Sequence, residues 1–152
     1  MNRREVLKLG VSVVVAGLFA KSLEAKDFRK EKPAAWKDKT IKKAIKDLFG
    51  TDVMSKTGVE IKAPEIAENG AVVPVTIKSA PADTKVLAVL QDADPESLAA
   101  VITVHPRSIP EDISLRLKLK KSGKVVVVAQ TADGKLHYDE KKVKVTMGGC
   151  GG

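Results

Sequence analysis

The sequence is poor in the residues that build most metal, redox and base-stacking sites. Its 152 residues include one cysteine, Cys150, and two histidines, His105 and His137. A lone cysteine cannot form an internal disulfide and excludes a zinc site made of several thiolates. Aromatic residues make up 3% of the chain, which leaves almost no platform for the bases of a single-stranded nucleic acid. We therefore expect no metal, no bound cofactor and no nucleic-acid partner.

The sequence also lacks an apolar run long enough to cross a bilayer as a helix, which takes about 20 residues. Its longest run, residues 9–20, follows a basic start that contains Arg3 and Arg4. A basic start, a short apolar stretch and a small residue after it form an export signal. The arginine pair resembles the twin-arginine type. We expect residues 1–25 to be removed and the remainder to be periplasmic, without stable membrane anchoring; the alternative is an uncleaved membrane anchor.

The balance of charge is basic, with 27 Lys+Arg against 19 Asp+Glu, and 43% of the residues are hydrophobic. This composition is typical of a soluble globular protein, and the length fits one domain, which we expect over residues 26–147. In an exported protein, the positive charge indicates a partner surface or small anions. The alternative is a solvated surface without a task.

The patterns along the chain predict a helix followed by strands. Residues 26–33 are charged and predict a loose leader. Residues 34–49 place their apolar side chains on one face of a helix, and Gly50 is placed to end that helix. Beyond Gly58, short apolar or alternating segments indicate strands, at Val72–Lys78, Lys85–Gln91, residues 113–120, Val125–Thr131 and Lys141–Met147. This spacing predicts a mainly β fold, a two-sheet β-sandwich with an N-terminal helix; a small barrel is the alternative.

Two features of these strands carry further expectations. Pro74 lies inside a strand pattern, which predicts an edge strand or a bulge. The run Val125–Thr131 is almost continuously apolar and therefore needs cover on both faces. We expect a partner protein to provide part of that cover, because exposed apolar patches of more than a few hundred Å² usually mark an interface.

The end of the chain holds its only thiol between glycines. Gly148 and Gly149 precede Cys150, and Gly151 and Gly152 follow it. Glycine adopts conformations closed to other residues, so we expect residues 148–152 to form a flexible arm. No histidine is near Cys150 in sequence to lower its pKa. This arrangement favours a thiol presented to the active sites of other proteins; an incidental cysteine is the alternative.

This ending, after Val143-Lys-Val-Thr146, resembles that of the SoxY family of sulfur carriers. Further similarity lies in residues 61–70 and 73–77, the Asp94-Pro95 turn, residues 115–119 and residues 131–134. The resemblance implies an immunoglobulin-like β-sandwich. It also implies that Cys150 is the covalent attachment point for thiosulfate-derived sulfur, held as a cysteine S-thiosulfonate, and that the chain is a carrier rather than an enzyme.

The resemblance also implies partners. The family forms a heterodimer with a second β-sandwich subunit, SoxZ. The carrier meets a heme-containing enzyme that links sulfur to the thiol, a hydrolase that releases sulfate and, in some organisms, a sulfane dehydrogenase. Two other functions fit the same ending: a sulfur carrier activated at its terminal Gly151-Gly152 carboxylate, and a binding module that Cys150 tethers by a disulfide.

Other polar residues carry weaker signals. Asp92 and Asp94 flank Ala93 just before Pro95, which favours a plain turn over an oxygen-ligand metal site. His105 and His137 are expected to be surface or packed residues rather than metal ligands. The segment Glu65–Gly70 predicts a hairpin turn that, under the family resemblance, helps to shape the subunit interface.

Overall fold

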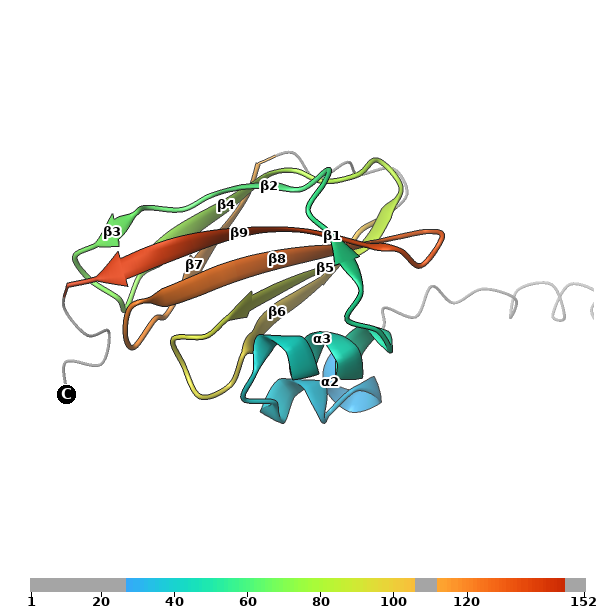
Figure 1. Ribbon diagram of the computed structural model, residues 1–152, viewed down its shortest axis with the longest axis horizontal. Coiled ribbons are helices and arrows are strands. Elements are labelled where there is room, and N and C mark those ends of the chain that lie inside the picture. Colours follow the sequence, from blue (N-terminus) through green and yellow to red (C-terminus); the bar gives the residue numbers. More distant parts are fainter. Residues whose placement is uncertain (1–26, 106–111, 147–152) are drawn as a thin grey trace, which may run out of the picture.

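The computed structural model describes residues 27–105 and 112–146, arranged as two stacked β-sheets with short helices against one of them (Figure 1). The predicted export signal and carrier arm lie outside the described residues. Within them, no helix is long and apolar enough to cross a membrane.

The helical part consists of three pieces, α2 (Phe28–Glu31), η1 (Ala35–Lys37) and α3 (Ile41–Phe49). The prediction of a loose leader over residues 26–33 was wrong in part, because residues 28–31 form the helix α2. The Asp27 side chain caps this helix by accepting a hydrogen bond from the N–H of Arg29 at 3.1 Å. The single predicted helix over residues 34–49 is also divided. Asp38 is extended, and Thr40 caps a new helix by accepting from the N–H of Lys43 at 3.3 Å.

The predicted helix end is confirmed. Gly50 has a φ of 79°, the left-handed conformation in which glycine ends a helix without strain, and its N–H donates to the carbonyl of Lys46 at 2.8 Å. The described strands are β1 (Met54–Ser55), β2 (Glu60–Lys62), β3 (Ile66–Ala67), β4 (Val73–Ser79), β5 (Thr84–Gln91), β6 (Leu98–Thr103), β7 (Ile113–Leu117), β8 (Gly123–Thr131) and β9 (Leu136–Val145).

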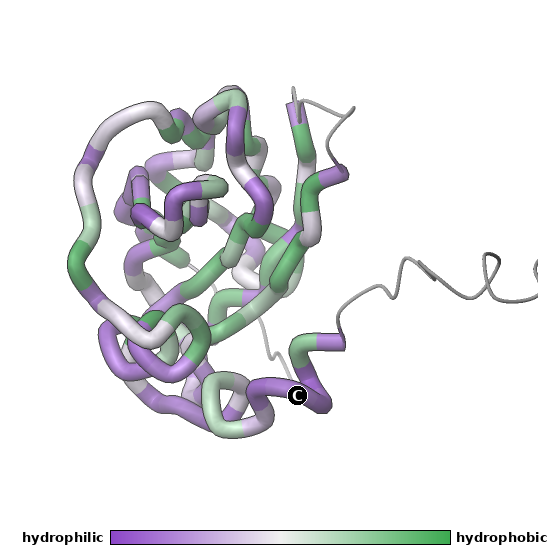
Figure 2. Tube along the Cα trace, turned by 90° about the vertical axis from the view of Figure 1, so that its right-hand side faces the viewer, coloured by the Kyte–Doolittle hydropathy of each residue, from purple (hydrophilic) through white to green (hydrophobic). Residues whose placement is uncertain are grey.

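The larger sheet runs in the order β1-β9-β8-β5-β6, with β3 also paired to β9, and the smaller sheet in the order β2-β4-β7. The main core fills the space between them, and its residues on β4, β5 and β8 are inaccessible to solvent, as for Val75, Val89 and Val127. In Figure 2 the hydrophobic stretches follow the strand layers, while hydrophilic residues gather at the loops and helices. The two-sheet sandwich predicted from the sequence is therefore confirmed.

The second face of β8 is covered by the chain itself. Val126 and Val128 of β8 pack with Ala44, Ile45 and Leu48 of α3 in a second apolar cluster on the outer side of the larger sheet. The expectation that this strand needs two covered faces is confirmed, but the inference of a partner from it was wrong. The amphipathic helix provides the cover that the sequence argument assigned to another protein.

The predictions for Pro74 and for the segment Glu65–Gly70 have different outcomes. Pro74 is in β4, the middle strand of the smaller sheet, yet β2 ends opposite Thr76, so β4 is an edge strand at the proline. The turn at Asn69-Gly70 exists, with the Asn69 side chain accepting from the N–H of Ala71 at 3.0 Å. It is no hairpin, because β3 pairs with β9 of the larger sheet and the turn leads into β4 of the smaller one.

Candidate functional site: the root of the C-terminal arm

Cys150 and the glycines around it lie outside the described residues, which end at Thr146. The structure therefore gives the geometry of the root from which residues 147–152 continue. We define the arm root as Lys144, Val145 and Thr146 together with the residues that hydrogen-bond to them. It lies at the far end of β9, beside β3 (Figure 1).

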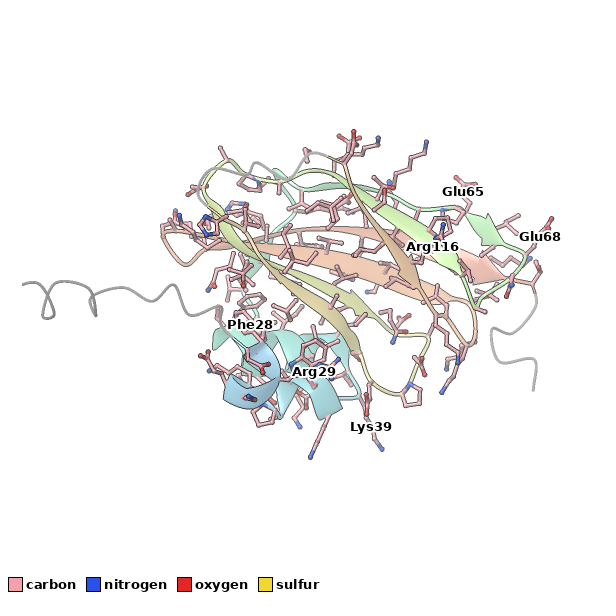
Figure 3. All side chains as sticks on the ribbon, turned by 180° about the vertical axis from the view of Figure 1, so that it is seen from behind. Phe28, Arg29, Lys39, Glu65, Glu68 and Arg116 are labelled. Atoms are coloured by element: carbon pink, nitrogen blue, oxygen red, sulfur yellow. The ribbon has the colours of Figure 1, made fainter. Side chains whose placement is uncertain are left out.

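One edge of the arm root is fixed by the short strand β3. β3 runs parallel to β9, with Ile66 opposite Lys144 and Ala67 opposite Val145. The N–H of Lys144 donates to the carbonyl of Glu65 at 2.8 Å, and the N–H of Thr146 donates to the carbonyl of Ala67 at 3.1 Å. Figure 3 shows Glu65 at this end of the sandwich, away from the helices. Backbone pairing therefore orders this edge as far as Thr146.

The other edge is fixed by a side chain. The ladder between β8 and β9 ends with Gly123 opposite Val143, so no strand lies beside Val145 on that side. Ser122 takes its place: its Oγ accepts from the N–H of Val145 at 2.8 Å and donates to the carbonyl of Val145 at 3.4 Å. One hydroxyl thus satisfies both backbone groups of the last strand residue.

The turn that carries Ser122 is held by the loop after β5. The Asp92 carboxylate accepts from the N–H of Lys124 at 2.6 Å, and the N–H of Asp92 donates to the carbonyl of Lys124 at 3.2 Å. Gly123 permits this approach, because a Cβ there would lie 2.5 Å from Asp92 Oδ1 and 2.9 Å from the Cβ of Ala93. Asp92 therefore fixes the turn that carries Ser122 and, through Ser122, the position of the arm root.

The neighbouring Asp94 also has a structural contact, an ion pair with Lys120 at 2.9 Å. Among the residues that the structure describes, no group of three or more His, Cys, Asp and Glu side chains is placed to hold a metal ion. The plain turn expected at Asp92-Ala93-Asp94 is what the structure has, with each carboxylate engaged by a lysine backbone or side chain.

A shallow depression of about 560 Å³ lies beside the arm root. Its lining is basic in balance, with three lysines and one glutamate among Glu65, Ser122, Gly123, Lys141, Lys142, Val143 and Lys144. Cations close to a thiol favour its thiolate form and attract anionic groups bound to it. The arm root therefore provides a positive environment near the place where the thiol-bearing segment begins.

Both histidines lie at the opposite end of the sandwich. His137 is the second residue of β9, and its Nδ1 contacts the Oγ1 of Thr57 at 3.1 Å. A strand rises about 3.3 Å per residue, so roughly 26 Å separates His137 from Val145. His105 is exposed and follows Val104, whose N–H donates to the carbonyl of Lys85 near the start of β5, at the same far end. Neither belongs to a group of three or more His, Cys, Asp and Glu side chains placed to hold a metal ion among the described residues.

The distance that the arm can span is limited. β9 ends at Val145, two residues before the predicted Met147, and Thr146 is the last residue with a described hydrogen bond. The four residue steps from Thr146 to Cys150 extend at most about 14 Å. Since His137 lies roughly 26 Å from the arm root, it is beyond the distance over which it could activate the thiol.

The sequence argument missed the residues that hold the arm root. Ser122-Gly123 is a turn signal, and it marks the boundary between the alternating residues 113–120 and the apolar run of β8. Nothing local indicated that Ser122 bonds to Val145, because that contact depends on which strand β9 pairs with. The two-residue strand β3 was likewise too short to give a periodic signal.

Comparison with known proteins places the chain in a family. The family model described as sulfur oxidation protein SoxY matches residues 45–150. A solved structure, the sulfur carrier protein SoxY from Chlorobium limicola f thiosulfatophilum, is 39% identical with a TM-score of 0.61, and the alignment covers 69% of this chain and 94% of that one. A comparison with curated protein sequences gave no match.

A second solved structure is similar in fold alone. Superoxide reductase (neelaredoxin) from Ignicoccus hospitalis is 19% identical with a TM-score of 0.51, over 59% of this chain and 80% of that one. The SoxY match, in contrast, takes in most of the sandwich and extends through Cys150. With this sequence match and the structural relative at 39% identity, the chain belongs to the SoxY family of sulfur oxidation proteins.

Proposed function

We propose that this chain is a periplasmic sulfur carrier that holds thiosulfate-derived sulfur covalently on Cys150 and presents it to separate enzymes. The observation that carries the proposal is the family match, whose last matched residue is Cys150 itself. The name of the Chlorobium relative, a sulfur carrier protein, supports the same role. The thiol lies between glycines, the residue type with the greatest backbone freedom: Gly148, Gly149, Gly151 and Gly152.

The geometry of the described residues supports a carrier rather than an enzyme. A catalytic cysteine is held against a base or a helix terminus that lowers its pKa. Here both histidines lie at the end of the sandwich opposite the arm root, with His137 bonded to Thr57. The base, the oxidant and the water-activating groups are therefore supplied by the enzymes that the arm enters.

The proposed loading step joins two sulfur atoms by oxidation. The Cys150 thiol loses its proton, thiosulfate reacts as the dianion through its outer sulfur, and a heme enzyme takes two electrons as the S–S bond forms. The product is a cysteine S-thiosulfonate. In the next step, water attacks the sulfonate sulfur and the S–S bond to that sulfur breaks. Hydrogen sulfate departs, and a persulfide remains on Cys150. A sulfane dehydrogenase, where present, oxidises the remaining sulfur.

The proposal includes a stable partner and an export route. Family membership supports a SoxZ-like β-sandwich subunit as the heterodimer partner. Arg3 and Arg4 direct export through the twin-arginine pathway, and cleavage after Ala25 releases the chain into the periplasm, where its sulfur-processing enzymes act. No nucleic acid and no membrane anchor have a part in this function.

The test is the intact mass of the protein isolated from the periplasm of thiosulfate-grown cells. We expect masses above that of the unmodified chain that begins at Lys26, all removed by a reductant. Cys150→Ser should lose every adduct and keep the melting temperature. Ser79→Ala, which also changes one small side chain but at the exposed last residue of β4, should keep the adducts. Normal thiosulfate oxidation in cells that carry only Cys150→Ser would refute the proposal.

The same spectra separate the two alternative functions. Sulfur attached to the terminal carboxylate of Gly152, and retained in Cys150→Ser, would indicate a carrier of the Gly-Gly type. A single stable adduct with the mass of another protein would indicate a module tethered by a disulfide. Fragment masses that place sulfur on Cys150 support the proposed chemistry.

A further inference from the structure

One long side of the sandwich is closed by the chain itself and the other is open. On the closed side, β1 and β3 pair with the outer edge of β9, and Asp139 of β9 accepts a hydrogen bond from the N–H of Ile61 on β2 at 3.0 Å. On the open side, β6 is the last strand of the larger sheet and β7 the last strand of the smaller one. No described strand pairs with the outer edge of either.

The inner faces of these two edge strands reach solvent. Core residues on β4, β5 and β8 are inaccessible, whereas the core-facing residues of the open side are only partly buried: Ala100, Ile102, Val104, Ile113 and Leu115. We call these five residues the open seam. They belong to the hydrophobic core by their packing, yet part of their apolar surface remains in water, which is the condition that a second protein would relieve.

The edge of β6 carries neither a charge nor a proline, and its one irregularity is at its start, where Ala99 has no partner on β5. Edges are commonly protected by lysine, proline, a bulge or a covering segment. β6 reads Leu-Ala-Ala-Val-Ile-Thr, with neither a charge nor a proline. Its start is covered, since the N–H of Ser97 donates to the carbonyl of Asp38 at 2.9 Å, and Val101 and Thr103 further along line a hollow together with Phe28, Arg29 and Trp36.

The direction of the backbone groups on β6 can be assigned. The N–H of Val104 donates across to the carbonyl of Lys85, the second residue of β5, at 2.8 Å. In an antiparallel pair, alternate residues bond to the same neighbour. The N–H groups of Val101 and Thr103 therefore point away from β5, toward the open side. They are available to a strand that approaches β6 from another chain.

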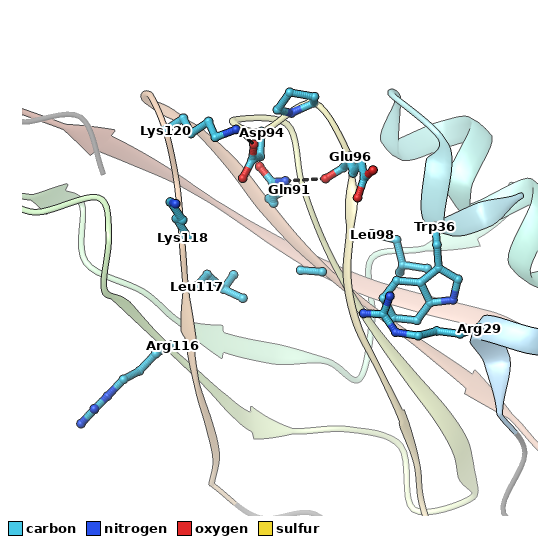
Figure 4. A pocket seen from close by; sticks show the side chains of 12 residues that line it. Arg29, Trp36, Gln91, Asp94, Glu96, Leu98, Arg116, Leu117, Lys118 and Lys120 are labelled. Atoms are coloured by element: carbon cyan, nitrogen blue, oxygen red, sulfur yellow. Dashed lines mark hydrogen bonds and ion pairs between the residues drawn. The ribbon is translucent and has the colours of Figure 1, made fainter. Parts of the chain in front are cut away.

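The rim of the open side is positively charged. A groove of about 550 Å³ lies between β7 and the start of β6 (Figure 4). Arg29, Arg116 and Lys118 line it, none of them in an ion pair among the described residues, while Glu96 is the only unpaired acid. In Figure 4 Leu117 points from β7 into this groove, and Leu98 and Trp36 lie on its other side. The groove thus joins apolar surface to a cationic rim.

We propose that the open seam and the free edge of β6 bind an edge strand of the second β-sandwich subunit, and that this subunit carries acidic residues opposite Arg29, Arg116 and Lys118. The inference rests on the heterodimer in the proposed function. A second copy of this chain would bring the same cationic rim, and residues 26–152 carry 23 Lys+Arg against 17 Asp+Glu, a formal net charge of +6, so like charges would oppose it. A subunit of opposite charge fits both the edge and the rim.

The test measures the dissociation constant between the purified chain and the SoxZ subunit of the same organism by calorimetry. Thr103→Pro removes one outward N–H without breaking a bond to β5, and Thr103→Val is its control because it keeps that N–H. We expect Thr103→Pro to weaken binding about tenfold or more and Thr103→Val to leave it nearly unchanged. Melting temperatures establish that both variants fold.

A second pair of variants tests the rim independently of strand pairing. Arg116→Glu should weaken binding about tenfold or more and reduce its dependence on salt. Lys62→Glu makes the same charge change on β2, at the other edge of the smaller sheet, and should have little effect. This pair keeps the proposal testable if Thr103→Pro fails to fold.

Several results would overturn the proposed surface. Equal affinities for Thr103→Pro and Thr103→Val would exclude pairing at the β6 edge. Equal affinities for Arg116→Glu and Lys62→Glu would exclude the rim. A homodimer that Thr103→Pro dissociates would assign the edge to a second copy. If the wild-type chain binds no SoxZ while Cys150 carries sulfur adducts in cells, the surface proposal fails and the carrier proposal stands.

Discussion

Ser122 forms hydrogen bonds with both backbone groups of Val145, accepting from the N–H at 2.8 Å and donating to the carbonyl at 3.4 Å. The two residues are far apart in sequence, and the contact lies where β8 no longer pairs with β9. One side chain therefore fixes the end of the strand that leads to Cys150. The position of the arm root depends on this hydroxyl and on β3 together.

The first prediction is that Ser122→Ala releases the end of β9. We expect faster hydrogen exchange at the amides of Val145 and Thr146, because one edge of the arm root loses its partner, and a loss of about 1 kcal/mol in the free energy of unfolding. Exchange measured residue by residue by NMR checks this. Ser79→Ala is the control, since Ser79 is exposed on β4 and its hydroxyl has no described partner. Unchanged protection at Val145 in Ser122→Ala would contradict the prediction.

A second prediction concerns the glycine beside Ser122. Gly123→Ala places a Cβ 2.5 Å from Asp92 Oδ1 and 2.9 Å from the Cβ of Ala93, so the loop after β5 has to move. We expect a loss of about 1–3 kcal/mol in the free energy of unfolding, as for other overpacked sites. Chemical denaturation measures it.

Asp92→Ala provides the matched comparison for Gly123→Ala. It removes the oxygen that the new Cβ would meet, and it also removes the acceptor for the N–H of Lys124. The double variant should therefore be less destabilised than the two single losses added together, because the two changes share one contact. Strict additivity would show that the cost of the added Cβ at Gly123 does not arise from its contact with Asp92.

Much of the strand layout could be predicted, because its signals are local. Residues 113–120 alternate apolar and polar side chains, and in the structure Leu117 and Leu119 are buried while Arg116 and Lys118 are exposed. The Asp133-Gly134 signal gives the hairpin between β8 and β9, with a φ of 82° at Gly134. A period of two residues and a tight turn need no knowledge of distant segments.

The features that could not be predicted depend on contacts between distant parts of the chain. Whether β8 meets a helix or a partner on its second face depends on where α3 docks, and the apolar run alone does not contain that information. β1 and β3 are two residues long and exist because β9 offers them an edge. Ser122 acts at the arm root only because β3 and β8 place Val145 beside it.

The third prediction concerns pH and the hairpin that begins β9. Hydrogen bonds from the Thr131 hydroxyl and from the N–H of Lys135 hold the pKa of Asp133 below its ordinary value of 3.8. A lowered pKa in the folded state stabilises the protein above pH 3.8, and this stabilisation is lost as the pH falls through the folded-state pKa. Asp133→Asn should therefore lower the melting temperature at pH 7 and have a progressively smaller effect as the pH falls below 3.8.

Melting curves of the wild type and the variant at both pH values check this prediction. Asp83→Asn is the control, because it removes the same charge from a carboxylate without a hydrogen bond or ion pair to the described residues. Its melting temperature should follow that of the wild type at pH 7. An Asp133→Asn effect that is equally large at pH 7 and at low pH would show that charge plays no part in the hairpin's stability.

The last prediction concerns the glycines before the carrier cysteine. If the arm has to enter the clefts of several enzymes, then replacing both Gly148 and Gly149 with valine should slow sulfur transfer strongly, because each Cβ restricts the backbone and adds bulk within the cleft. Stability should change by no more than about 0.5 kcal/mol, as is typical of surface positions outside a packed core. The measurement is thiosulfate turnover by a reconstituted enzyme set, with the melting temperature of each variant. Alanine at both positions should give an intermediate rate, and Ser122→Ala tests whether the fixed root matters separately. A valine variant that turns over at the wild-type rate would show that the glycines serve no role in transfer.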